Sequence, residues 1–292
     1  MNRALTFLLV TVSIFAVIGV RVMRGNKSEI TVQRNLVYGK VENEELQLDL
    51  AMPSADNGPF PAVVFLHGKG WKAGNRQEMN HFVEGVARMG YVGATVEYRL
   101  VPVARFPAPV EDCKAAVRWL RANAKNYRIN PDRIGVVGFS AGGHLACMLG
   151  VTDKTVGLEG DGGNPEQSSR VQAVVSFFGP TDFTTYDWSN DLKKDVIVPF
   201  LGGSFSDKPE VYQKASPINY VTKDAPPFLL FHGTEDKLVP VDQSKRLAEK
   251  LKGVGVSVRV VVLEGEGHGF TDAYNQVCMK QMLDFLDKRL RQ

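Results

Sequence analysis

The sequence predicts an α/β fold with a mostly parallel central sheet of about eight strands, helices on both faces and an antiparallel hairpin at the start. Short apolar runs alternate along the chain with segments whose apolar residues recur at three- and four-residue spacing. Several of these runs are continuous, as in strands that are buried on both faces. The first two strand-like segments instead alternate apolar and polar residues, and only a polar turn at 42–44 separates them.

The individual elements follow in order. Strands are predicted at 35–40, 45–51, 62–66, 91–98, 134–139, 173–178, 228–231 and 256–263. Helices are predicted at 77–89, 109–126, 141–150, 242–252 and 272–291. Segments 153–169 and 181–225 follow neither period. Because ligands bind at the carboxyl edge of open α/β sheets, we expect both segments to cross that edge and to form walls of a pocket.

Composition favours an ordinary globular protein. The chain has 292 residues, of which 44% are hydrophobic and 23% are charged, so one domain of about 250 residues or two smaller ones would fit. The net charge is +3, and the first 27 residues hold four basic residues and no acidic one. The rest of the chain is therefore close to neutral, which argues against nucleic acid as a partner because phosphate binding needs a clustered positive surface.

The start of the chain is typical of a targeting segment. Residues 4–20 are uncharged and mostly apolar, with Arg3 before them and Arg21 after them. As a helix this segment would span about 25 Å, slightly short for a membrane core yet longer than most apolar regions of signal peptides. We expect residues 1–28 to be a signal peptide or a signal anchor and residues 29–292 to form the folded domain. That domain would be exported: secreted, periplasmic, or anchored to the membrane through residues 4–20.

Cysteine usage excludes two kinds of structure. Cys113, Cys147 and Cys278 are an odd and sparse set without a Cys-x-x-Cys pair, so neither a disulfide-built scaffold nor a cysteine-based zinc site is expected. Each cysteine lies in an apolar helical pattern, which favours small buried side chains. A single disulfide stays open as an alternative.

The most informative segment is a Gly-x-Ser-x-Gly sequence at 138–142. It follows an apolar strand and opens a helical pattern, which is the strand-turn-helix context of a nucleophile elbow. Small residues beside Ser140 permit a strained turn, and the helix start supplies the free N–H of Ala141 at a positive dipole end. A Gly-rich packing turn is the alternative. We predict that Ser140 is a nucleophile.

A serine nucleophile needs a base, and the base needs an orienting carboxylate. Among five histidines, His268 follows the last predicted strand in a Gly-rich loop, where the chain order of nucleophile, acid and histidine would place the base. Carboxylates follow two successive strands, at Asp182 and Asp236. We choose Asp236, because Pro240 fixes its loop before a helix. Asp182 is expected to be a turn or cap residue, and Glu266 is expected to be solvated.

The segment His-Gly-Lys-Gly-Trp follows the first continuous apolar strand and is predicted to stabilise developing negative charge. Preorganised N–H donors are usually the largest electrostatic contribution to acyl transfer, with one donor worth roughly 3–4 kcal/mol. We assign the oxyanion hole to the backbone amides of Lys69, Gly70 and Ala141, with Gly68 as a substitute. Trp71 either seals this loop or lines an acyl pocket in a functional role, or it packs in the interior.

These residues resemble those of α/β-hydrolase serine esterases of the hormone-sensitive-lipase type and of secreted bacterial esterases that deacylate plant polysaccharides, such as acetyl xylan and feruloyl esterases. The resemblance spans most of 36–291. Beyond the loop and the elbow, it includes EYRL at 97–100, FPA at 106–108, VRWLR at 117–121, NPDRI at 130–134 and HGTED at 232–236. It implies an α/β-hydrolase catalytic domain and a Ser-His-Asp mechanism without metal or organic cofactor.

Three departures from the family pattern bear on the site. Lys69 replaces the middle glycine of the usual His-Gly-Gly-Gly loop, so this backbone must reach the loop conformation with a Cβ present. Phe139 precedes the serine where lipase-type members commonly carry Asp, which favours the polysaccharide-esterase branch. The extended N-terminal cap helices of the lipase type are not expected here, and the pocket would then be open to large leaving groups.

The resemblance implies a serine esterase that cleaves short acyl esters, with an acyl ester or an acylated carbohydrate as substrate. A peptidase or amidase on the same fold and a non-catalytic binding protein stay alternatives. The former usually carries a long extra domain, and the intact set of Ser140, Asp236 and His268 counts against the latter. The acyl chain, the alcohol moiety, the oligomeric state and the cleavage of 4–20 are not determined by the sequence.

Overall fold

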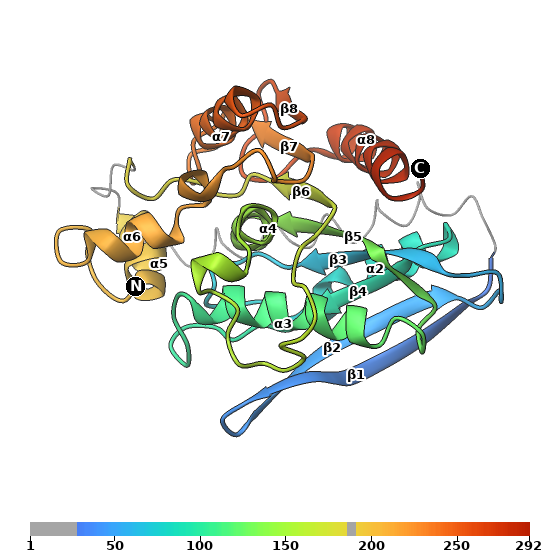
Figure 1. Cartoon of the computed structure of the whole chain (residues 1–292). Coiled ribbons are helices and arrows are strands. Elements are labelled where there is room, and N and C mark those ends of the chain that lie inside the picture. The colour runs from blue at the N-terminus through green and yellow to red at the C-terminus, as the bar shows by residue number, and fades with distance from the viewer. Residues whose placement is uncertain (1–27, 186–190) are drawn as a thin grey trace, which may run out of the picture.

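The computed structural model of the chain describes residues 28–185 and 191–292. Its strands are β1 (Ile30–Val41), β2 (Glu44–Pro53), β3 (Phe60–Leu66), β4 (Val92–Val96), β5 (Ile129–Phe139), β6 (Ala173–Phe177), β7 (Phe228–Gly233) and β8 (Val258–Leu263). They form one sheet in the order β1-β2-β4-β3-β5-β6-β7-β8. β2 pairs antiparallel with β1 and with β4, and all other neighbours are parallel (Figure 1). The predicted α/β fold with an antiparallel start is confirmed.

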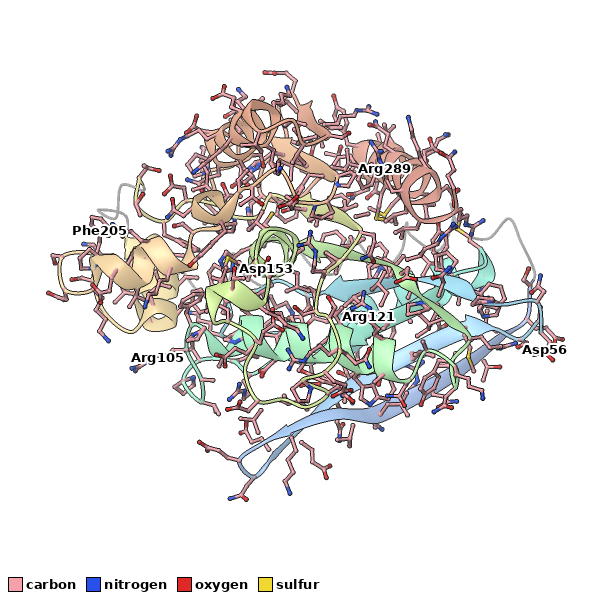
Figure 2. All side chains as sticks on the ribbon, in the orientation of Figure 1. Asp56, Arg105, Arg121, Asp153, Phe205 and Arg289 are labelled. Atoms are coloured by element: carbon pink, nitrogen blue, oxygen red, sulfur yellow. The ribbon has the colours of Figure 1, made fainter. Side chains whose placement is uncertain are left out.

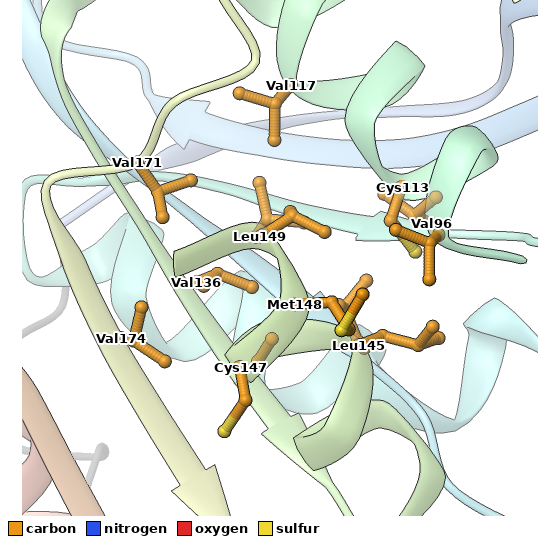
Figure 3. Packing of buried hydrophobic residues seen from close by; sticks show 14 of the residues in the cluster. Val96, Cys113, Val117, Val136, Leu145, Cys147, Met148, Leu149, Val171 and Val174 are labelled. Atoms are coloured by element: carbon orange, nitrogen blue, oxygen red, sulfur yellow. The ribbon is translucent and has the colours of Figure 1, made fainter. Parts of the chain in front are cut away.

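Helices cover both faces of this sheet. They are α2 (Asn80–Arg88), α3 (Ala108–Ala122), α4 (Ala141–Val151), α5 (Asp191–Leu201), α6 (Pro209–Ala215), α7 (Asp242–Gly253) and α8 (Asp272–Leu290), with short 3₁₀ turns η2 (Arg76–Met79), η3 (Lys154–Val156) and η4 (Pro217–Tyr220). Side chains alternate across β3: Val64 packs in a core with α3, α4 and α7, whereas Val63 packs in a second core with α2 and α8. Figure 3 shows the first core, where Leu145 and Met148 of α4 lie near Cys113 of α3.

The strands at the start are longer than predicted. β1 is an edge strand with one neighbour, and most of its residues are at least partly exposed. Polar side chains are tolerated on both faces of such a strand, so they obscured its alternation in the sequence. β5 begins at Ile129, because this residue pairs with Phe60 before the ladder resumes at Ile134.

The two segments without a clear period lie in different places. Segment 181–225 contains α5 and α6, which lie beyond the carboxyl ends of the parallel strands, as expected (Figure 1). The same expectation is wrong for 153–169. Glu159 there bonds Lys114 Nζ at 2.7 Å and Arg118 Nη1 at 2.8 Å, so this segment lies along the outer side of α3. The physical reason is that α4 runs antiparallel to β5 and delivers the chain to the amino edge of the sheet.

Arg121 fixes the end of the same segment. Its guanidinium donates to the carbonyl oxygens of Ser168 and of Arg170, and also to that of Pro131 at 2.9 Å. Figure 2 shows Arg121 on α3. The segment therefore packs against α3 and does not line the candidate active site.

Two further expectations concern the chain as a whole. Cys113, Cys147 and Cys278 are buried and free, as their helical patterns favoured. The targeting segment at 4–20 lies outside the described residues. Within the part that is described, no helix is both long enough and apolar enough to cross a membrane.

Candidate active site

Ser140 occupies a sharp turn between β5 and α4. Its backbone has φ 54° and ψ −116°, a strained conformation for a residue with a Cβ, and its N–H donates to the Phe177 carbonyl at 2.9 Å. A Cβ at Gly138 would collide with the Gly142 carbonyl, and a Cβ at Gly142 would collide with the Leu66 carbonyl. The flanking glycines are thus required by close backbone approach, and the turn presents the Ser140 hydroxyl at the carboxyl edge of the sheet.

The structure brings together the three residues that the sequence assigned to a triad. Ser140 Oγ lies 2.8 Å from His268 Nε2, and His268 Nδ1 lies 2.7 Å from Asp236 Oδ2. His268 stands in the loop between β8 and α8, and Asp236 stands in the loop between β7 and α7. The three side chains form one continuous line of hydrogen bonds, although they come from distant parts of the sequence.

The Asp236 carboxylate is buried and held by several donors. Its Oδ1 accepts from the backbone N–H groups of Leu238 at 2.9 Å and Val239 at 2.8 Å. Burial opposes ionisation, but hydrogen bonds from His232, His268 and the Val239 amide outweigh it and hold the pKa of Asp236 well below its usual range. The carboxylate is therefore charged throughout the neutral and mildly acidic range.

The other two carboxylates serve local structure. Asp182 accepts from the N–H of Thr184 at 2.9 Å and pairs with Arg246 at 2.8 Å, which agrees with its predicted role in a turn. The expectation that Glu266 is solvated is wrong. It is 6% exposed and accepts from both the N–H and the hydroxyl of Thr271, each at 2.7 Å. The start of α8 needs an acceptor for its first donors, and Glu266 supplies one by folding the loop back.

The predicted oxyanion loop lies directly against the elbow. Lys69, Gly70 and Trp71 all have positive φ, at 71°, 65° and 55°, so Lys69 reaches the left-handed conformation despite its Cβ. Within residues 28–185 and 191–292, no oxygen accepts a hydrogen bond from the amide of Lys69 or Gly70. Ala141 is the first residue of α4, where amides have no partner within the helix. These three amides are available to an anionic oxygen.

Contacts from two other elements support this loop. Lys69 Nζ pairs with Glu78 Oε1 at 2.7 Å, which ties the loop to η2. On the other side, a Cβ on Gly70 would lie 2.8 Å from Val196 Cγ1 of α5. Trp71 is buried and stacks on Phe200 of α5 at 4.1 Å between ring centroids. Of the two interpretations of Trp71, the structure supports interior packing.

Two residues that contact the triad, His232 and Phe178, were not predicted from the sequence. His232 contacts Asp236, and Phe178 packs on the His268 ring with 4.6 Å between centroids. The position of His232 four residues before Asp236 could have indicated the contact between these two side chains. Nothing in the sequence indicates that Phe178, with φ 43°, would face the imidazole. In the described ranges, no group of three or more His, Cys, Asp or Glu side chains could hold a metal ion.

Comparison with known proteins identifies the family. The model of the BD-FAE family matches residues 48–251, which is more than half of the chain. The chain belongs to the BD-FAE family of α/β-hydrolase esterases.

Curated proteins and solved structures agree with this family membership. Esterase LipC of Mycobacterium tuberculosis is 35% identical over 225 residues, which cover 73% of this chain and 53% of LipC. Carboxylesterase NlhH from the same species is 32% identical, with 73% of this chain and 67% of NlhH covered. The chain spans about half the length of LipC and of other curated relatives that it matches.

Two solved structures cover nearly the whole chain. A truncated carbohydrate esterase from gut microbiota superposes with a TM-score of 0.80 and 28% identity, covering 92% of this chain and 99% of that one. Propionate-bound esterase Est2 of Thermogutta terrifontis superposes with a TM-score of 0.71 and 28% identity, covering 91% of this chain and 93% of Est2. This BD-FAE chain thus has the fold of these esterases over most of its length.

Proposed function

We propose that this BD-FAE chain is a serine esterase, a carboxylic ester hydrolase (EC 3.1.1.-) that hydrolyses short-chain esters through Ser140, His268 and Asp236. The observation that supports this most is the line of hydrogen bonds from Ser140 Oγ to His268 Nε2 and from His268 Nδ1 to Asp236 Oδ2, at 2.8 and 2.7 Å. The fold alone would not support an esterase activity, because one fold hosts many activities. The esterases among the relatives add independent support.

In the proposed reaction, His268 Nε2 removes the hydroxyl proton as Ser140 Oγ bonds to the ester carbonyl carbon. The carbonyl electron pair moves to oxygen, where the amides of Lys69, Gly70 and Ala141 would donate to it. Collapse breaks the bond to the alcohol, and His268 protonates that leaving oxygen. Water then repeats the sequence on the acyl-enzyme, releasing the acid and restoring Ser140. Each step uses groups of this chain, so the mechanism calls for neither metal nor organic cofactor.

We propose acetyl groups on plant polysaccharide as the substrate. The support comes from neighbours: the carbohydrate esterase named above, at a TM-score of 0.80, and the bifunctional GH43-CE protein of Bacteroides eggerthii, at 0.79 and 32% identity. Est2 bound to propionate and Est2 bound to butyrate support a short acyl group.

We also propose that the protein is exported. The apolar residues 4–20 between Arg3 and Arg21 support this, with 1–28 as the targeting segment and 29–292 as the catalytic domain. Fractionation of cells that produce the tagged full chain tests it. The protein should leave the cytoplasm, and a variant with Arg substituted at two apolar positions of the segment should stay inside. Equal cytoplasmic retention of both proteins would contradict export.

A rate series tests the proposed activity. We expect the full chain to hydrolyse p-nitrophenyl acetate faster than the butyrate and the octanoate, and to release acetate from acetylated xylan. Ser140→Ala should abolish all of these activities. Turnover that survives in Ser140→Ala would overturn the elbow assignment. No ester turnover, together with cleavage of peptide or amide substrates, would favour an amidase, and no turnover at all would favour a binding protein.

A further inference from the structure

A second histidine contacts the proposed catalytic acid, and its ring is buried. We infer that His232 is a positioning residue for Asp236, and that Ser244 holds the His232 ring in the orientation that this role needs. The inference rests on the proposed function, because it concerns the same carboxylate. It adds a second hydrogen-bonded pair behind the three residues already described.

The surroundings of His232 Nε2 determine its proton. His232 lies near the end of β7 with no exposed surface. Its Nε2 lies 2.7 Å from the carbonyl oxygen of Val239 and 3.3 Å from Asp236 Oδ2. A carbonyl oxygen only accepts, and an ionised carboxylate only accepts. Nε2 must therefore be the protonated nitrogen. Its N–H donates to the Val239 carbonyl, and Asp236 Oδ2 is a second and longer contact.

The other ring nitrogen faces a hydroxyl. Nδ1 of His232 lies 2.7 Å from Ser244 Oγ, and Ser244 of α7 is 1% exposed. A neutral imidazole has one N–H, and here Nε2 holds it, so Nδ1 accepts from the Ser244 hydroxyl. The Val239 carbonyl and the Asp236 carboxylate thus fix the tautomer, and Ser244 fixes the orientation of the ring, in the way that outer partners do in other histidine sites.

The contact with His232 completes the set of donors around Asp236. Oδ1 accepts from the amides of Leu238 and Val239, and Oδ2 accepts from His268 and His232. A carboxylate has about four acceptor positions, so all are used. Rotation of this carboxylate would leave buried donors unpaired, which is costly. His232 thus helps to keep Oδ2 turned toward His268.

A purely structural role is the competing explanation, because His232 also anchors the loop through Val239. Substitutions at His232 separate the two roles in the full chain, assayed on p-nitrophenyl acetate. His232→Met removes both N–H and acceptor at similar volume, whereas His232→Gln keeps an N–H donor near the Nε2 position. Since hydrogen bonds to charged groups are the strong ones, we expect His232→Met to lower kcat by about tenfold to hundredfold. KM should change less than about twofold, and His232→Gln should recover most of kcat, because the missing donor acts on the acid and not on substrate binding.

Ser244→Ala provides the second arm, with Ser216→Ala as its matched control. Ser216 is equally buried, but its hydroxyl donates to the Tyr212 carbonyl at 2.7 Å, away from the acid. Both alanine variants should lower the melting temperature, yet only Ser244→Ala should lower kcat. Equal kcat values in wild type, His232→Met and Ser244→Ala would overturn the inference, as would equal losses in His232→Met and His232→Gln.

Side-chain ¹⁵N NMR of labelled histidine gives a readout that does not depend on activity. The His232 resonance, assigned from its loss in His232→Gln, should report the neutral ring with the proton on Nε2 in wild type. Ser244→Ala should keep the proton on Nε2 but move the Nδ1 resonance, because that nitrogen loses its hydrogen bond from the hydroxyl. A wild-type ring protonated on Nδ1 alone would refute the inference even if the chain proved to have no esterase activity. Loss of the proposed function itself would appear separately, as absence of turnover that depends on Ser140.

Discussion

Lys69 illustrates how a single residue can meet a backbone demand that usually falls to glycine. Its φ of 71° lies in the left-handed region, which costs a residue with a Cβ roughly 1–2 kcal/mol. Its Nζ pairs with Glu78 Oε1 at 2.7 Å, and both side chains are mostly buried, at 24% and 17% exposed. The ion pair holds the loop that carries the proposed oxyanion donors, the amides of Lys69 and Gly70.

Breaking this pair should therefore weaken catalysis. We expect Lys69→Met and Glu78→Gln each to lower kcat by roughly threefold to tenfold, which is the effect of losing a partly buried ion pair that positions two donors. The double variant should lose little more than either single one, because both changes remove the same contact. Kinetics on p-nitrophenyl acetate test this, and losses that simply multiply in the double variant would contradict it.

The two candidate acids make a sharper contrast. Asp236→Asn removes the charge that orients His268 and should lower kcat by about 10⁴-fold, as in other triads. Asp182→Asn leaves that chain of hydrogen bonds intact and should change kcat by less than about threefold, because only the contacts to Thr184 and Arg246 weaken. Measuring both variants on one ester decides between them, and the reverse ranking would move the acid to Asp182.

Individual site residues were predictable where a motif and the chain order agree. Ser140 sits in the elbow sequence, and His268 and Asp236 each follow a strand whose carboxyl end the fold places at the same edge. The buried state of Glu266 was not predictable, because it depends on how far its loop folds back. That distance is set by side-chain and backbone donors at the next helix, which the pattern of apolar residues does not record.

At the scale of elements, α5 and the oxyanion loop act as a pair. Gly70 has φ 65° and its missing Cβ would lie 2.8 Å from Val196 Cγ1, and Trp71 stacks on Phe200 of the same helix. Helix α5 belongs to the long segment that follows β6, so an insertion at the carboxyl edge shapes the loop that would bind the oxyanion. This arrangement gives the segment a supporting role in addition to the expected one of a pocket wall.

A pair of substitutions tests the contact between α5 and the loop. Gly70→Ala adds a Cβ against Val196 and at a positive φ, and we expect kcat to fall by about tenfold. Val196→Ala in the same chain should recover part of that loss by making room, while alone it should have a small effect. If Val196→Ala gives no recovery on p-nitrophenyl acetate, backbone strain at Gly70 and not the contact with α5 explains the loss.

Most elements were predicted to within a few residues, because the central strands are continuous apolar runs between amphipathic helices. Segment 153–169 was the main error. Its Gly-rich and acidic composition is typical of a loop at a binding edge, but its Glu159 pairs with two buried cations. Lys114 has no exposed surface and Arg118 almost none, and both bond Glu159. A pattern based on one segment could not show that the partners of its charges lie on α3.

The whole molecule should lose stability as the medium becomes acidic. Burial lowers the pKa of His67, His81 and His144 to about 4 in each case. In the unfolded chain these rings titrate near pH 6.5. Folding depresses these pKa values, so above pH 6.5 the rings are neutral in both states and do not change the free energy of unfolding. As the pH falls to 4, each ring lowers the free energy of unfolding by up to about 3 kcal/mol, because the unfolded chain binds the proton more readily.

We therefore expect the melting temperature to fall between pH 7 and pH 4, measured by calorimetry or by circular dichroism. His144 Nε2 lies 2.8 Å from the carbonyl oxygen of Ala215, and His144→Gln keeps a donor for that oxygen but cannot titrate. This variant should show a shallower fall over the same range. An identical pH dependence in wild type and His144→Gln would contradict the assignment.

In the proposed enzyme, Ser140 is the nucleophile and is activated by His268 and Asp236. The most direct test is intact-protein mass spectrometry after brief treatment of the full chain with a fluorophosphonate, which traps an activated serine covalently. We predict a single adduct that peptide mapping locates at Ser140, that is absent in Ser140→Ala and that forms far more slowly in His268→Ala. No adduct, or an adduct on another serine in the wild type, would contradict the account.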